Sequence, residues 1–215
     1  MHFLHSIIFS DFQLGEHGLG RGLEGARDVG PVSFQCQKSS RYKMRLRFSP
    51  TQIEHWASSY PIGKLEPSLL ALAPAIKQSG FLTKDQLHGL AQWKSARSAP
   101  RTLLNSEKYV REVTLFALST NDERARIQSL TILDGVLWPT ASVILHLFHP
   151  EPYPLLDFRA LWSVGEKVPA QYSFEFWLRY VQYCRKLAEK QGVSMRVLDR
   201  ALWQYSSVNQ PGEAS

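Results

Sequence analysis

Cysteine is nearly absent from this chain: its 215 residues include only Cys36 and Cys184. Two cysteines cannot hold an iron–sulfur cluster that needs four thiolates, so no cluster of that kind is expected. Because the two lie far apart in the sequence, they also give no disulfide framework of the kind that small secreted proteins use. This sparing use of cysteine is typical of proteins in the reducing cytoplasm, which is the localisation that we predict.

The chain also lacks a long apolar run. No stretch approaches the roughly 18 residues of a membrane span, so no membrane association is expected. The apolar start of the sequence has neither a basic flank nor a small-residue cleavage site, so we predict no signal peptide. There are no internal repeats, no Gly-rich phosphate loop and no convincing pair of strands. Helices are therefore the predicted elements.

Acidic residues are outnumbered by basic ones, 19 to 25, which gives a formal net charge of +6 and a pI of about 9.4. This excess favours a polyanionic partner such as nucleic acid, although many basic proteins have no such partner. Hydrophobic residues make up 44% of the chain, enough for a core. The length fits one domain, and we expect a monomer.

Glycine is concentrated near the N-terminus. Glycines punctuate residues 15–30, a segment without helical or strand periodicity, and basic and apolar residues then alternate from Arg41 to Phe48. We predict a poorly ordered Gly-rich leader with a basic segment over residues 1–44. The alternating segment is interpreted as a solvated linker, a short strand or a basic arm on DNA. The helical domain is predicted over residues 45–206, with a frayed tail over 207–215.

Helix starts are marked by capping residues. In a capping box, a Ser or Thr and a Glu or Gln three residues later satisfy each other's backbone N–H groups. Such boxes occur at Ser49, Thr83 and Thr120, each followed by apolar residues three and four apart. Pro74 interrupts another apolar run. Between two of these helices, residues 95–105 are predicted to be a loop too polar for the core.

The most informative stretch is residues 133–157. It opens with a turn at Gly135, a residue that readily takes a positive φ. Pro139 suits the first turn of the next helix, which is apolar nearly all round and is therefore expected to be buried. A Pro-rich connection follows. Asp157 then opens another predicted helix, from Phe158 to Val164.

This stretch resembles the helix-hairpin-helix DNA glycosylases, the superfamily that includes endonuclease III and the 8-oxoguanine glycosylases. The family pattern is roughly Leu-Pro-Gly-Val-Gly-x-Lys-Thr-Ala, then a helix, a loop and an aspartate that opens the next helix. Asp157 matches the catalytic aspartate at the spacing of the endonuclease III branch. The matching hairpin positions here are Leu133, Gly135, Val136, Thr140 and Ala141. The resemblance extends from Leu133 to about Leu161.

The resemblance implies an all-α, helix-hairpin-helix DNA glycosylase-like bundle that binds DNA, with Asp157 as its catalytic carboxylate. It implies that the hairpin contacts DNA, through Gly135, Val136, Leu137, Trp138 and Thr140. The basic stretch 93–111 is either a further phosphate-binding surface or an ordinary solvated one. Its candidate DNA contacts, with one from the helix after Asp157, are Lys94, Arg97, Arg101 and Arg159.

The chain departs from the family at two hairpin positions. Leu137 stands where a second glycine lets backbone N–H groups approach a phosphate, which weakens the expectation of phosphate binding there. Pro139 stands where bifunctional members carry the lysine that forms a Schiff base. Proline has no amine, so lyase chemistry by that route is excluded, and the resemblance implies a monofunctional glycosylase without a cofactor.

Each candidate has a plainer alternative. Asp157 is either catalytic or only the N-cap of the next helix, since aspartate is among the best caps. Arg159 contacts DNA or pairs with Asp157, or else belongs to a surface ion pair. A flipped base needs aromatic stacking partners, yet the same side chains are common in helical cores. The candidates of this kind are Trp93, Trp138, Tyr153 and Trp162.

No metal site is predicted. His146 and His149 are three residues apart, a spacing compatible with metal ligation, but Glu151 is the one further ligand nearby. Three functions remain: a monofunctional DNA glycosylase, a non-catalytic DNA-binding relative that kept the fold, and a helical partner-binding protein. Asp157 favours the first, and Leu137 and Pro139 favour the other two.

Overall fold

The computed structural model describes residues 44–63 and 65–211, and these residues contain helices but no strand. The predicted all-helical class is therefore confirmed for the described part of the chain. None of its helices is long and apolar enough to cross a membrane. The elements are η1 (Pro50–Gln52), α1 (Ile53–Ser58), α2 (Glu66–Ala71), α3 (Ala73–Ser79), α4 (Lys84–Ser95), η2 (Ala99–Leu104), α5 (Glu107–Ser119), α6 (Glu123–Leu130), α7 (Trp138–Phe148), α8 (Phe158–Ser163), α9 (Phe174–Gln191) and α10 (Met195–Asn209), where η marks a 3₁₀ helix.

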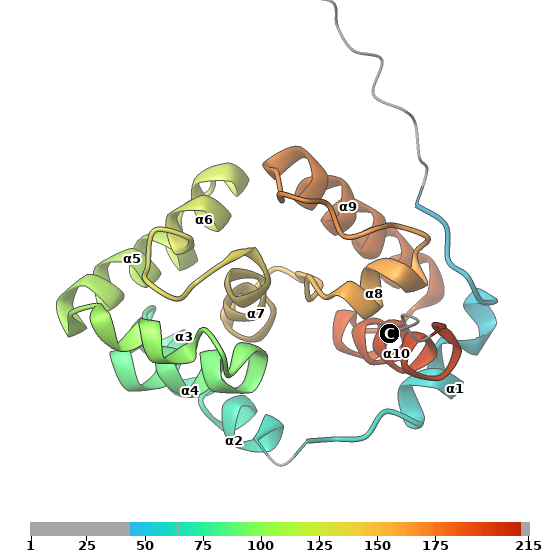
Figure 1. Cartoon of the computed structure of the whole chain (residues 1–215), viewed down its shortest axis with the longest axis horizontal. Helices are drawn as coiled ribbons and strands as arrows, with labels where there is room; N and C mark the ends of the chain where they lie inside the picture. Colours follow the sequence, from blue (N-terminus) through green and yellow to red (C-terminus); the bar gives the residue numbers. More distant parts are fainter. Residues whose placement is uncertain (1–43, 64, 212–215) are drawn as a thin grey trace, which may run out of the picture. The chain divides into compact units, whose positions relative to one another are not determined.

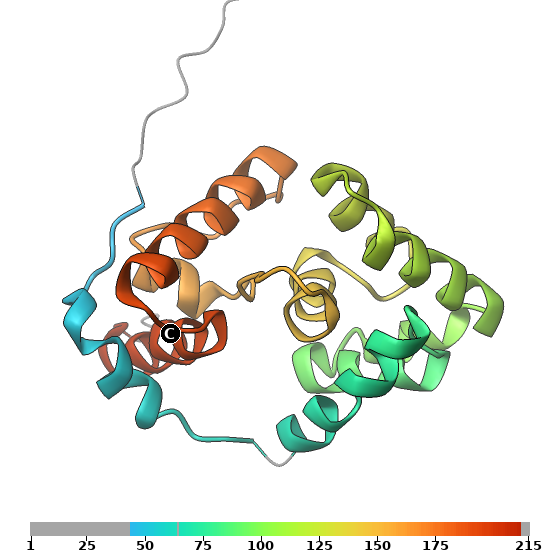
Figure 2. The same ribbon diagram turned by 180° about the vertical axis from the view of Figure 1, so that it is seen from behind.

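The described helices form two groups, which Figures 1 and 2 show from opposite sides. One group contains α2 to α6, with α7 packed against α3, α4 and α6. In the other, α10 packs against α1, α8 and α9. The chain crosses between the groups twice, before α2 and after α7. As predicted from its composition, α7 is buried along most of its length.

The segment from Met44 to Phe48 corrects the predictions made for it. It is neither a strand nor a solvated linker, because the side chains of Met44 and Phe48 are buried. The backbone N–H groups of Arg45 and Arg47 donate to carbonyl oxygens at the end of α8, each at 2.9 Å. The alternating pattern of basic and apolar residues thus places the apolar side chains against the core and the arginines at the surface. The rest of the predicted leader, residues 1–43, lies outside the described residues.

Four further helix boundaries can be compared with the predictions. The capping boxes at Ser49 and Thr83 are confirmed. The one predicted at Thr120 is wrong: α6 begins later, because Asp122 accepts the N–H of Ala125 at 2.7 Å and caps it instead. The tail is also shorter than predicted, since α10 continues to Asn209.

Candidate functional site

The predicted hairpin turn lies between α6 and α7. Gly135 has φ +78°, as expected for a turn glycine, and the N–H of Val136 donates to the carbonyl of Leu133 at 3.1 Å. A Cβ atom on Gly135 would lie 2.8 Å from the backbone nitrogen of Thr102 in η2. The glycine is therefore required both for the turn and for close packing against η2.

The polar stretch 95–105 supports this hairpin and is not the solvent-exposed loop that was predicted. Ala99, Thr102 and Asn105 are buried. The Asn105 side chain donates to the carbonyl of Asp134 and accepts the N–H of the same residue, each at 3.0 Å. Polarity misled the prediction because these buried polar groups have partners: Asn105 bonds to the hairpin backbone, and the Thr102 hydroxyl donates to the carbonyl of Ala99 within η2.

The five hairpin residues predicted to contact DNA are placed differently. The side chains of Val136 and Thr140 are buried, so only their backbone groups can reach a ligand. Trp138 is half-buried, and its ring lies 6.3 Å from that of Trp177. Leu137 is 66% exposed and caps α7 without a side-chain hydrogen bond. The exposed hairpin surface is thus apolar at the position where the glycosylases that the sequence resembles have glycine.

Asp157 caps α8, as predicted: one carboxylate oxygen, Oδ1, accepts the N–H of Arg159 at 3.0 Å. The other, Oδ2, accepts a hydrogen bond from Nζ of Lys94 at 2.6 Å. The two side chains are only 18% and 12% exposed. Lys94 was predicted to contact DNA phosphate from a basic surface, and the structure instead places it against the candidate catalytic carboxylate.

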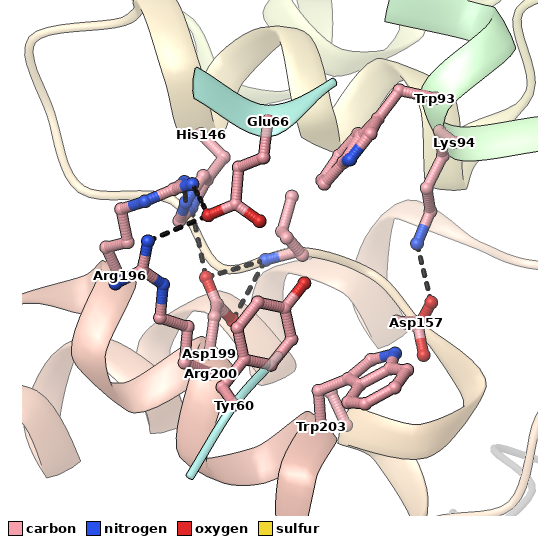
Figure 3. A pocket seen from close by; sticks show the side chains of 12 residues that line it. Tyr60, Glu66, Trp93, Lys94, His146, Asp157, Arg196, Asp199, Arg200 and Trp203 are labelled. Carbon is pink, nitrogen blue, oxygen red and sulfur yellow. Dashed lines mark hydrogen bonds and ion pairs between the residues drawn. The ribbon is translucent and has the colours of Figure 1, made fainter. Parts of the chain in front are cut away.

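This ion pair borders a cavity of about 250 Å³ between the two helix groups (Figure 3). The indole rings of Trp93 from α4 and Trp203 from α10 lie across the cavity from each other. The cavity is slightly smaller than the roughly 300–1,000 Å³ of sites that bind drug-sized molecules. The complete lining is Tyr60, Glu66, Trp93, Lys94, His146, Leu155, Asp157, Ala160, Arg196, Asp199, Arg200 and Trp203.

Glu66 faces the ion pair from the far side of the cavity. Its side chain is 3% exposed, and Oε1 accepts hydrogen bonds from the guanidinium groups of Arg196 and Arg200, the latter at 2.8 Å. Burial alone would raise the pKa of Glu66, but the two guanidinium groups lower it below its ordinary value of 4.5. Glu66 is therefore a fixed negative charge held by two positive ones.

His146 and Asp199 extend this polar wall. Nδ1 of His146 lies 2.7 Å from the carbonyl oxygen of Tyr153 and 3.0 Å from Oδ2 of Asp199, while its Nε2 lies 3.2 Å from Nη1 of Arg196. The two oxygen atoms near Nδ1 can only accept a hydrogen bond, and the guanidinium near Nε2 can only donate one. This arrangement favours the tautomer of His146 with the proton on Nδ1. Asp199 also accepts the N–H of Leu155, and its burial raises its pKa. The wall is thus held rigidly by paired groups.

The Glu66 cluster makes stability depend on pH. Folding lowers the pKa of the Glu66 carboxyl below its ordinary value of 4.5. The stability that its charge contributes is therefore fully present above pH 4.5 and is lost as the pH falls through the lowered pKa. We expect Glu66→Gln to destabilise the protein by about 2 kcal/mol at neutral pH, since it leaves two guanidinium groups without a charge partner. Between about pH 6 and pH 3, the variant should lose less stability than the wild-type protein. Urea unfolding across this range measures both quantities.

The matched control is Glu175→Gln. Glu175 also pairs with an arginine, Arg124 at 2.6 Å, but both side chains are more than half exposed. Exposed pairs contribute little, so this variant should follow the wild-type pH dependence closely. Equal changes in the two variants would contradict a special role for the buried cluster.

The other predicted DNA-binding arginines and the aromatic candidates can now be placed. Arg97 and Arg101 are exposed, and Arg101 adjoins the part of η2 that packs against Gly135. Arg159 does not pair with Asp157; its guanidinium lies 5.1 Å from the ring centre of Trp203. Of the four aromatic candidates, only Trp93 lines the cavity.

The other three aromatic candidates belong to packing elsewhere. Tyr153 is buried, stacks on Trp177 and donates to Glu123, and its burial raises its pKa to about 12. Trp162 stacks on Tyr205. Among the described residues, no group of three or more His, Cys, Asp or Glu side chains is placed to hold a metal ion.

Several cavity residues had a signal in the sequence that was overlooked. Lys94 follows Leu87, Leu90 and Ala91 at helical spacing, so it occupies a core-facing position of α4. On α10, positions 196, 199, 200 and 203 likewise share one helical face. Charged side chains within a core-facing stripe indicate a polar cavity. No family model, curated protein or solved structure matches the chain, so its function has to be inferred from this geometry.

Proposed function

We propose that the protein binds duplex DNA and hydrolyses the N-glycosidic bond of a base turned out of the helix, with Asp157 as the catalytic carboxylate. The observation that carries the proposal is the position of Asp157. It is anchored through Oδ1 at the start of α8, and its carboxylate borders a cavity with an indole at either side. An enzyme that acts on a base must hold it outside the stack, and aromatic rings are suited to that task.

Breaking the N-glycosidic bond builds positive charge on the sugar. A fixed carboxylate stabilises that charge without reorganising and can also orient or deprotonate the attacking water. In the free protein, the charge of Asp157 is opposed by Lys94, 2.6 Å away. If the ammonium group of Lys94 moves to a DNA phosphate when DNA binds, the carboxylate of Asp157 loses this partner and is free to act on the sugar. Lys94 would then contact Asp157 in the free protein and a phosphate in the complex.

The DNA-binding part of the proposal relies on the hairpin and the basic side chains near it. Arg97 and Arg101 are exposed on the segment that supports Gly135, where they are free to neutralise phosphates. The first turn of α7 has no side-chain cap, and helix N-termini favour anions. Backbone contacts from the hairpin and charge contacts from η2 would then position the duplex.

A second candidate is a DNA-binding protein without catalysis. Leu137 favours it, because this exposed side chain occupies the place where the family's glycine lets a phosphate approach. The Lys94–Asp157 ion pair fits this candidate too, as a purely structural link between the two helix groups.

A panel of duplexes separates these candidates. Each carries one altered base, such as uracil, hypoxanthine, 8-oxoguanine or an alkylated purine, and abasic sites are scored by cleavage with hot alkali. Release of any base by the wild-type protein supports the glycosylase. Binding of the duplexes without release leaves the non-catalytic candidate, and no binding at all favours a partner other than DNA.

A further inference from the structure

One carboxylate in the wall of the cavity has an oxygen that faces the cavity. The side chain of Glu66 is 3% exposed, and its Oε1 accepts hydrogen bonds from both Arg196 and Arg200. The other oxygen, Oε2, points away from these two guanidinium groups and toward the middle of the cavity (Figure 3). Buried acceptors are normally hydrogen-bonded, so an acceptor directed into a cavity indicates a place for a ligand that donates.

Tyr60 provides a donor beside this acceptor, because it lines the same cavity. Burial and the nearby negative charge of Glu66 raise the pKa of the Tyr60 hydroxyl, which therefore keeps its proton at neutral pH. It can donate either to Glu66 or to a ligand next to it. Although burial opposes ionisation of Glu66, the two guanidinium groups hold its pKa below the ordinary value. The carboxylate therefore only accepts hydrogen bonds.

The position of Asp157 sets the direction in which a base would lie. In the proposed function, the sugar and the glycosidic nitrogen are next to Asp157, and Glu66 lies at the opposite end of the cavity (Figure 3). The indole rings of Trp93 and Trp203 can hold the two faces of the base between these ends. Glu66 then meets the exocyclic group farthest from the sugar, which is on C4 of a pyrimidine and on C6 of a purine.

We propose that Glu66 selects bases that carry an amino group at this position, as cytosine and adenine do, and rejects bases that carry a carbonyl there, as uracil and hypoxanthine do. The inference rests on the part of the proposed function that places a base in this cavity. An amino N–H donates to Oε2, and the unprotonated ring nitrogen beside the amino group accepts from the Tyr60 hydroxyl. A carbonyl would instead place a second acceptor against the carboxylate and leave both oxygen atoms without a donor.

Matched base analogues test this preference without DNA. The pairs are 9-methyladenine with 9-methylhypoxanthine and 1-methylcytosine with 1-methyluracil, in which the methyl group stands for the sugar. Within each pair, only the amino or carbonyl group and the proton on the ring nitrogen beside it differ. Isothermal titration calorimetry on the full-length protein measures the dissociation constants, and the pair that binds distinguishes a purine site from a pyrimidine site.

We expect the amino member of at least one pair to bind about 10-fold or more tightly than the carbonyl member, because hydrogen bonds to charged groups are stronger than those between neutral groups. Equal binding within both pairs, a preference for the carbonyl members, or no binding of any analogue would overturn the inference.

Glu66→Gln should reverse the preference. The guanidinium groups of Arg196 and Arg200 only donate, so they hold the amide oxygen where Oε1 was and turn the NH₂ group toward the cavity. A donor at this place favours the carbonyl member, and the ratio of the two dissociation constants should shift by about 10-fold or more. This ratio does not depend on how much of the variant is folded, because unfolded chains weaken the apparent binding of both members equally. A folded variant that keeps the wild-type preference would contradict the role of Glu66.

The matched control is Glu175→Gln, which makes the same change of charge in an exposed ion pair with Arg124, outside the cavity. It should keep the wild-type preference. If Glu66→Gln does not fold, the ratios measured for the wild-type protein still decide the matter.

Failure of this inference can be told apart from failure of the proposed function. Base release from a duplex together with equal binding within both pairs would support the glycosylase and overturn selection by Glu66. A preference for the amino members without release from any duplex would support selection by Glu66 and oppose catalysis.

Discussion

Asp157→Asn should reduce base release by about 100-fold or more, a loss of about 2.7 kcal/mol of transition-state stabilisation. The substitution keeps the size of the side chain and its ability to cap α8, because asparagine caps helices about as well as aspartate. What it removes is the negative charge beside the cavity. Single-turnover measurements on a duplex from which the wild-type protein releases the base report this loss directly.

The stability of the Asp157→Asn variant should change less than its activity. The carboxylate also pairs with Lys94, and both side chains are largely buried, so loss of the charge should cost about 1–2 kcal/mol in unfolding free energy. Urea unfolding at the assay temperature shows whether the variant is still folded. A folded variant that releases the base at the wild-type rate would end the catalytic assignment.

Asp122→Asn is the matched control for Asp157→Asn. Asp122 caps α6 as Asp157 caps α8, with its carboxylate accepting the N–H of Ala125 at 2.7 Å. It is exposed and does not line the cavity. The same change of charge at this cap should leave base release unaltered. A similar loss in both variants would mean that the helix caps, and not a catalytic charge, explain the effect.

The features that could be predicted from the sequence are those with a local cause. A turn glycine, a cap and an apolar periodicity each depend on a few neighbouring residues. Gly135, the cap at Asp157 and the buried α7 were therefore predicted and found. The wrong helix start at Thr120 is a local error of the same kind, because Asp122 is also a good cap and lies closer to the helix.

The cavity could not be predicted in the same way, because its parts are distant in the chain. Lys94 and Asp157 are 63 residues apart, and Glu66 and Arg200 are 134 apart. Their meeting depends on how the two helix groups pack against each other, which no local pattern specifies. In the sequence, the largely buried Lys94 cannot be told by residue type from the exposed Arg97 and Arg101 that follow it. Helical phase alone does not distinguish them, because positions 97 and 101 fall on the same helical stripe as Lys94. The difference is that α4 ends at Ser95, so Lys94 is the last of these basic residues within the helix.

The largest effect on stability is expected for Gly135→Ala. At φ +78° an L-residue costs about 1–2 kcal/mol. The new Cβ would also lie 2.8 Å from the backbone nitrogen of Thr102 and 3.0 Å from the carbonyl oxygen of Ser98. Both atoms belong to the backbone, so η2 would have to move. That movement should weaken the two hydrogen bonds between Asn105 and Asp134, and crowding of this kind costs a further 1–3 kcal/mol, roughly.

We therefore expect Gly135→Ala to lower the unfolding free energy by about 3 kcal/mol, which corresponds to roughly 10 °C in Tm for a domain of this size. Gly192→Ala supplies the comparison, because Gly192 ends α9 at φ +65° with nothing within 4 Å of an added Cβ. It bears the backbone cost alone, about 1 kcal/mol. The difference between the two variants measures the packing of the hairpin on η2. If both lose the same amount, Gly135 serves only the turn, and its close packing against η2 does not contribute to stability.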